Sequence, residues 1–149
     1  MDDAVEKDKP EQKAEDPKKA GQGAPAFDWV TERSSCTLPK VFKELRLEVE
    51  ADIKTRNALR PNNSPYEFSV SEKGSDFTVI LQAKELRRSV TFTLAEHAIL
   101  ARDDKGEPMM ELTLTFDDQG KCKLHANKQE REMWQVRRMA LEDLLFRGY

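Results

Sequence analysis

The sequence has few of the residues that build metal centres, phosphate-binding loops or membrane spans. Its 149 residues include two cysteines, two histidines and six glycines. Cys36 and Cys122 are far apart and show no CxxC spacing, so we expect two thiols and no metal site. No stretch approaches the roughly 18 consecutive apolar residues of a membrane-spanning helix. These shortages predict a protein without a metal, a cofactor or a membrane segment.

Signatures of catalysis are also missing. The chain has no nucleophile elbow and no glycine-rich phosphate loop. Acidic turns at residues 103–107 and 117–120 bring carboxylates near a glycine, but neither has the spaced ligands and terminal glutamate of a calcium loop. We therefore expect plain hairpin turns there, and exposed side chains without a role at His97 and His125. We assign no catalytic residue, and we favour a binding protein over an enzyme.

Charged residues are abundant and concentrated at the beginning of the chain. Residues 1–25 hold seven acids, five lysines and three prolines but few apolar side chains, which predicts a disordered charged tail. Residues 26–149 then form a single domain whose 21 acids and 20 bases nearly balance. A nucleic-acid binder normally shows a clear basic excess, so nucleic acid is not expected as a partner. The tail also lacks the apolar core of a signal peptide, which favours the cytoplasm.

Hydrophobic periodicity predicts a helix followed by a sheet. Residues 37–59 place Val41, Leu45, Val49 and Ile53 on one face, with Thr37 as the N-cap. The period then changes from 3.6 to 2. Six alternating stretches follow, separated by short polar turns that contain glycine, and they are residues 66–70, 77–83, 89–94, 97–102, 110–116 and 121–126. Alternation of this kind is typical of an antiparallel sheet with one wet face.

A second helix is expected to end the chain, running to about Phe146 and opened by Asn127 as N-cap with Glu130 three residues later. Its apolar stripe includes Trp134, while Met139 and Phe146 fall outside the stripe. We therefore predict an α+β domain, a six-stranded antiparallel meander sheet with an N-terminal and a C-terminal helix packed on one face. A further short strand at residues 27–31 is expected to pair with an open edge.

Two resemblances accompany this pattern. Residues 122–141, CKLHANKQEREMWQVRRMAL, are similar to the end of pleckstrin-homology-like domains, with Trp134 at the place of their helix tryptophan. The long first helix has no place in that family. The order of short strand, helix, six strands and final helix resembles a reduced helix-grip fold, which implies a carrier of a small hydrophobic ligand. The large inward residues favour a filled core instead.

The candidate site consists of arginines on helix faces that should be apolar. Arg137 lies near the centre of the second helix's stripe, and Arg56 lies on the apolar side of the first helix, one turn after Asp52. They either pair with Asp52, Glu130 or another acid between the helices, or line a cleft that holds an acidic group of a partner. Arg138 and Arg131 would extend that patch.

These observations predict a non-catalytic protein-interaction module whose partner is another protein. The alternative is the hydrophobic-ligand carrier, in which case a small molecule is the ligand. A cavity beneath the C-terminal helix would favour the carrier, whereas a filled core with an apolar surface patch at Met139 and Phe146 would favour the interaction module. The Ser/Thr-rich wet face of the sheet is a further possible recognition surface, although threonine also suits a solvated strand.

Overall fold

The computed structural model describes residues 26–147, and the predicted tail at residues 1–25 lies outside them. The chain divides into two units, residues 1–30 and 31–149, and the sheet and the two long helices belong to the second unit. A short helix, α2 (Trp29–Ser35), replaces the strand that we expected at residues 27–31. That expectation is wrong. The alternation at Phe27, Trp29 and Thr31 is too short to distinguish a strand from a helical turn.

The first long helix forms where its apolar periodicity predicts. α3 spans Leu38–Ala58, with Thr37 at the N-cap and a proline in the first turn, where its missing N–H removes no hydrogen bond. Its four buried residues are Val41, Leu45, Val49 and Ile53.

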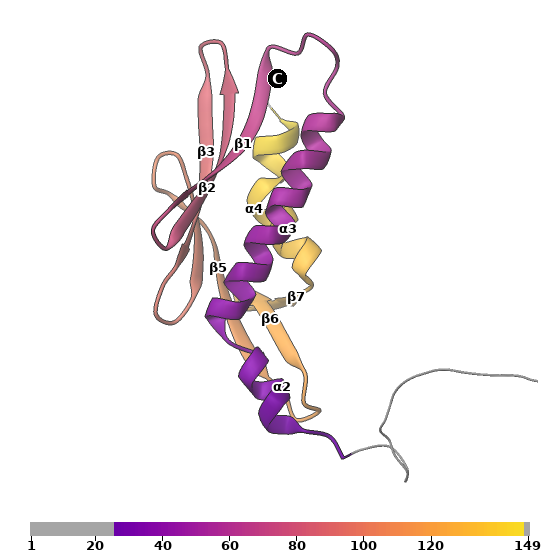
Figure 1. The fold of residues 1–149 in the computed structure, drawn as a ribbon. Helices are drawn as coiled ribbons and strands as arrows, with labels where there is room; N and C mark the ends of the chain where they lie inside the picture. The colour runs from indigo at the N-terminus through magenta and orange to yellow at the C-terminus, as the bar shows by residue number, and fades with distance from the viewer. Residues whose placement is uncertain (1–25, 148–149) are drawn as a thin grey trace, which may run out of the picture. The chain divides into compact units, whose positions relative to one another are not determined.

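The sheet is an antiparallel meander of seven strands in sequence order (Figure 1). The strands are β1 (Tyr66–Lys73), β2 (Asp76–Ala83), β3 (Arg87–Leu94), β4 (Ile99–Asp103), β5 (Pro108–Phe116), β6 (Cys122–Ala126) and β7 (Gln129–Arg131). The predicted α+β fold is confirmed, with one strand more than expected. α3 packs against β1 and β3, and the last helix packs against β3 and β5.

The extra strand corrects our prediction for the last helix. Asn127 and Lys128 have φ angles of 52° and 72°, and they form a two-residue turn because Ala126 pairs with Gln129. Asn127 is therefore not an N-cap, and Glu130 lies in β7. The helix α4 (Met133–Phe146) begins six residues later, where the Gln135 side chain accepts the backbone N–H of Glu132 at 2.8 Å.

The space between the sheet and the helices is filled by side chains. Phe77 stacks on Phe92 with 4.7 Å between ring centroids, and Phe42 of α3 reaches the Phe77 ring at 5.2 Å. Leu81 of β2 and Leu112 of β5 are fully buried. Such packing is what the large inward residues predicted.

One edge of the sheet is partly closed by α3. The Asn57 side chain accepts the Phe68 N–H at 3.0 Å and donates to the Phe68 carbonyl at 2.8 Å, as a neighbouring strand would. Arg60 also donates to the Tyr66 carbonyl. This part of the β1 edge is therefore blocked for strand addition. No helix within residues 26–147 is long and apolar enough to cross a membrane.

Candidate functional site

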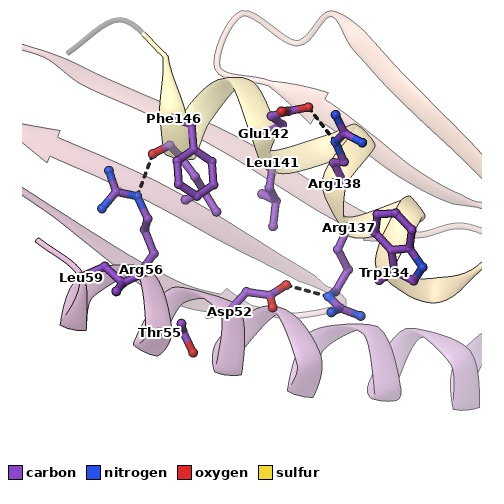
Figure 2. A pocket seen from close by; sticks show the side chains of 11 residues that line it. Asp52, Thr55, Arg56, Leu59, Trp134, Arg137, Arg138, Leu141, Glu142 and Phe146 are labelled. Atoms are coloured by element: carbon purple, nitrogen blue, oxygen red, sulfur yellow. Dashed lines mark hydrogen bonds and ion pairs between the residues drawn. The ribbon is translucent and has the colours of Figure 1, made fainter.

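A surface groove of about 370 Å³ lies between the C-terminal half of α3 and the length of α4 (Figure 2). The two helices run in the same direction, since Asp52 faces Arg137 and Arg56 faces Leu145 further along both. Leu141 and Leu145 in its lining are buried. The groove is therefore built from the two helices that the sequence predicted would pack side by side.

Large apolar side chains line this groove while remaining in contact with water. Leu59, Trp134 and Phe146 keep 68%, 51% and 61% of their surface exposed. Phe146 was expected in a surface patch, whereas Trp134 was expected in the buried stripe. Met139, 38% exposed, lines an adjoining pocket together with Trp134. Exposed apolar groups gathered in one concavity are unusual on a surface that has no binding role.

Arg137 is held by two carboxylates of α3. Its Nε donates to Asp52 at 2.6 Å and its Nη1 donates to Glu48 at 2.7 Å, and the arginine side chain is only 17% exposed. Figure 2 shows the side chain crossing from α4 to Asp52. This geometry is the paired arrangement with Asp52, one of the two alternatives from the sequence. Arg137 therefore connects α4 to α3, the two walls of the groove.

Arg56 reaches from α3 to the C-terminal end of α4. Its Nε donates to the Leu145 carbonyl at 2.9 Å, so it satisfies one of the carbonyls that a helix end leaves unpaired. The guanidinium carbon lies 5.0 Å from the Phe146 ring centroid, and the rings of Tyr66 and Phe68 are at 5.6 and 5.2 Å. Within residues 26–147, no carboxylate forms an ion pair with Arg56.

Of the other two predicted arginines, Arg138 lies on α4 and Arg131 is the last residue of β7. Arg138 is 62% exposed and its Nε donates to Glu142, one turn later, at 2.9 Å. Arg131 precedes the helix and donates to the Gln129 side chain at 2.6 Å. Arg138 lines the groove and the adjoining pocket, while Arg131 lines only the adjoining pocket. Arg131 and Arg138 thus lie near Trp134, whereas Arg56 lies at the other end of the groove, beside Phe146 (Figure 2).

Electrostatic effects at the edge of the site follow from these contacts. The hydrogen bond from Arg56, at 3.4 Å, lowers the pKa of the Tyr66 hydroxyl. On the sheet side of α4, the hydrogen bond from Arg88 lowers the pKa of Asp143. Arg88 and Asp143 are 2.8 Å apart and connect β3 to α4.

Sequence reasoning missed Trp134 and Glu48 as parts of the site. Trp134 precedes Arg137 by three residues and Arg138 by four, which places all three on neighbouring positions of the helix surface. That spacing could have indicated from the sequence that Trp134 belongs to the site. Glu48 carries no such signal within its own helix, because its partner is 89 residues away.

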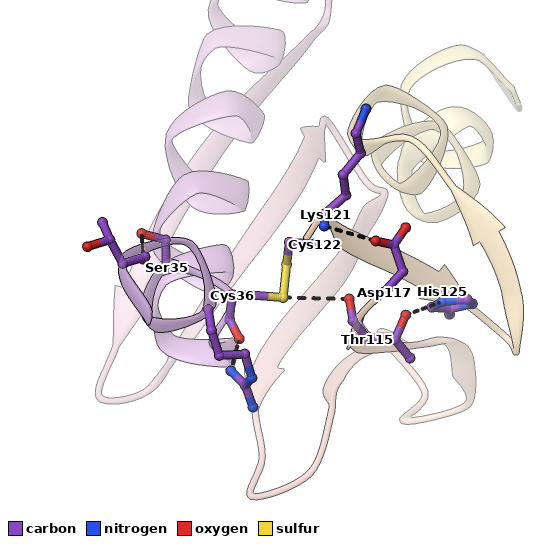
Figure 3. The surroundings of a disulfide bond; sticks show 9 residues. Ser35, Cys36, Thr115, Asp117, Lys121, Cys122 and His125 are labelled. Atoms are coloured by element: carbon purple, nitrogen blue, oxygen red, sulfur yellow. Dashed lines mark hydrogen bonds between the residues drawn. A yellow bond between two sulfur atoms is a disulfide. The ribbon is translucent and has the colours of Figure 1, made fainter. Parts of the chain in front are cut away.

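The two cysteines form a disulfide between the link from α2 to α3 and the start of β6 (Figure 3). Their Cα atoms are 5.4 Å apart, Cys36 is buried and Cys122 is exposed. The expectation of two thiols is therefore wrong. Eighty-six residues separate the pair in sequence, and only the folded sheet brings them together.

The acidic turns use their carboxylates internally. Asp103 Oδ1 accepts the backbone N–H groups of Lys105 and Glu107, and Asp117 Oδ1 accepts those of Gln119 and Lys121. These are the hairpin turns that the sequence predicted. His97 is exposed, while His125 is hydrogen-bonded to Thr115 at 2.9 Å. In the described part of the chain, no three acidic, histidine or cysteine side chains are placed to share a metal ion.

Comparison with known proteins provides no relative from which a role could be transferred. No protein-family model, curated protein or solved structure matches the chain.

Proposed function

We propose that this protein is a non-catalytic protein-interaction module that binds a segment of another protein in the groove between α3 and α4. The observation that carries the proposal is the half-exposed Trp134 beside Leu59 and Phe146 in one concavity. Tryptophan and arginine are the residues most enriched at the energetic centres of protein interfaces. The groove combines both.

The walls of the groove are held before any partner arrives. Arg137 ties α4 to Asp52 and Glu48, and Arg56 ties α3 to the Leu145 carbonyl. A site that is already ordered loses little conformational freedom on binding, which favours affinity. In this proposal Arg137 supports the site, whereas Arg56, Arg138 and Arg131 face the partner.

The groove also suits an interaction module better than the alternative, a carrier of a small hydrophobic ligand. Its volume of about 370 Å³ is within the range of ligand pockets, but it lies at the surface between the helices. Beneath the helices, Phe68, Phe77 and Phe92 pack with at most 2% of their surface exposed. A filled core with an apolar surface patch is the outcome that favours protein binding, and we do not expect nucleic acid as a partner.

Selection from a displayed library of helical peptides tests the proposal. The full chain is the target, and the double variant Trp134→Ala/Phe146→Ala is the counter-target. Leu47→Ala serves as the matched control, because Leu47 is an α3 residue 51% exposed that does not line the groove. We expect enrichment of amphipathic peptides that bind the wild type and Leu47→Ala but not the double variant. Equal binding to all three proteins would contradict the proposal.

For the location of the protein, the disulfide and the sequence point in different directions. The tail composition favours the cytoplasm, whereas Cys36–Cys122 favours an oxidising compartment, because cytosolic thiols are kept reduced. Alkylation of free thiols in freshly lysed cells distinguishes the cytoplasm from an oxidising compartment. Full protection of both cysteines supports an oxidising compartment, and rapid labelling of both supports the cytoplasm.

A further inference from the structure

We infer that the partner segment is an acidic amphipathic helix, with carboxylates seven residues apart that bind Arg56 and Arg138. This inference rests on the proposed function, because it names the chemistry of the occupant of the same groove. The arginines differ in the hydrogen-bonding capacity that each has left for a partner. Arg137 is neutralised by two carboxylates and is 17% exposed, so it has no role in recognising an acid.

Arg56 and Arg138 both line the groove and keep hydrogen-bonding capacity. Each uses its Nε for a contact within the protein, to the Leu145 carbonyl and to Glu142 respectively. Their terminal nitrogens make only one hydrogen bond within residues 26–147, the 3.4 Å contact of Arg56 with the Tyr66 hydroxyl. A guanidinium group presents further donors in a planar fork that matches a carboxylate.

The charge along the groove and the adjoining pocket is of the right sign for an acidic partner. The groove and the adjoining pocket are lined by four arginines, Arg56, Arg131, Arg137 and Arg138, and by two acids, Asp52 and Glu142. Glu48, which pairs with Arg137, adds a third acid, so this surface keeps an excess of one positive charge, although the whole chain has a formal net charge of −3. An acidic segment would be attracted to this face in preference to the rest of the molecule.

The spacing of the two arginines fits a helix. The Arg56 guanidinium is bonded at Leu145, and the backbone positions of Leu145 and Arg138 on α4 are seven residues apart, a rise of about 10 Å along the helix axis. Acids at positions i and i+7 of a partner helix are separated by the same rise and lie on nearly the same face. Apolar residues at i+3 and i+4 then fall between them, opposite Leu141, and Trp134 lies one turn beyond the acid that binds Arg138, as in other helix-in-groove complexes.

The test uses the full chain with Trp29→Phe, which leaves Trp134 as the only tryptophan. Four capped 18-residue peptides share an alanine-rich helical background with Leu at i+3 and Phe at i+4. Three of them carry glutamates, glutamines or lysines at both i and i+7. The fourth carries its glutamates at i+2 and i+9, on the opposite face of the helix. Trp134 fluorescence reports binding, and each protein variant is checked for unchanged thermal unfolding.

The glutamate peptide is expected to bind about tenfold more tightly than the glutamine peptide, and the relocated glutamates are expected to give no gain. Arg138→Gln should weaken the glutamate peptide about three- to fivefold without changing the affinity of the glutamine peptide. Arg56→Lys keeps the charge but not the fork, and should reduce the same preference. Equal affinities of the glutamate and glutamine peptides would overturn the acidic partner but leave the groove as a binding site. Absence of binding by every peptide would overturn both.

Discussion

Arg137→Met should destabilise the protein strongly because it leaves two carboxylates without their cation. Removing one partner of a buried ion pair costs about 3–5 kcal/mol. Glu48 and Asp52 keep 39% and 33% of their side-chain surface exposed, so water replaces part of what the arginine supplied. We therefore expect a loss of about 2–3 kcal/mol in the free energy of unfolding. Part of that loss is the repulsion between the two acids, which lie one turn apart on α3.

Urea unfolding of the full chain measures this effect, with the midpoint and slope fitted separately. The triple variant Arg137→Met/Glu48→Gln/Asp52→Asn removes the unpaired charges and should recover most of the lost stability. Arg138→Met is the matched control on the same helix, and because Arg138 is 62% exposed it should change stability by less than about 0.5 kcal/mol. A loss below about 0.5 kcal/mol for Arg137→Met, or no recovery in the triple variant, would refute the structural role of Arg137.

Three further predictions concern the framework. Replacing both Cys36 and Cys122 by alanine opens a loop of 86 residues and should cost about 4 kcal/mol in urea unfolding, so equal stability with and without the disulfide would contradict the fold at this end. Because Arg88 lowers the pKa of Asp143, their contact stabilises the fold fully above the unfolded pKa of an aspartate, and this stabilisation is lost as the pH falls through the lower folded pKa. The free energy of unfolding of Asp143→Asn should therefore decrease less steeply than that of the wild type as the pH is lowered. An unchanged pH dependence would exclude this contact. Phe92→Ala removes a fully buried ring and should cost about 3–5 kcal/mol by thermal or urea unfolding, whereas a loss under about 1 kcal/mol would show that the core is not filled at this position.

The regular elements could be predicted because their apolar periodicity is strong and their boundaries carry turn signals. α3 was expected at residues 37–59 and is found at Leu38–Ala58, where Thr37 and Pro61 mark its ends. Each of the six alternating stretches corresponds to a strand. β7 was missed because it has only three residues, and the asparagine that makes its turn is also a good N-cap residue.

The site was predicted only in part because its essential relations are between distant residues. The sequence singled out Arg137 and Asp52, since a charge on an apolar stripe requires a partner. It did not show that Glu48 is the second partner, or that Trp134 is half-exposed. The exposure of Trp134 depends on where α3 lies relative to α4, which the period of one helix does not determine. The disulfide was missed for the same reason.

The most direct test of the groove is a map of where the protein contacts the glutamate peptide. Backbone amide chemical shifts of the full chain, recorded during titration with that peptide, provide this map residue by residue. If the peptide binds in the groove, the perturbed amides concentrate at residues 52–59 of α3 and its C-cap and at residues 134–146 of α4. Perturbations confined to the Ser/Thr-rich outer face of the sheet, with the two helices unchanged, would contradict it.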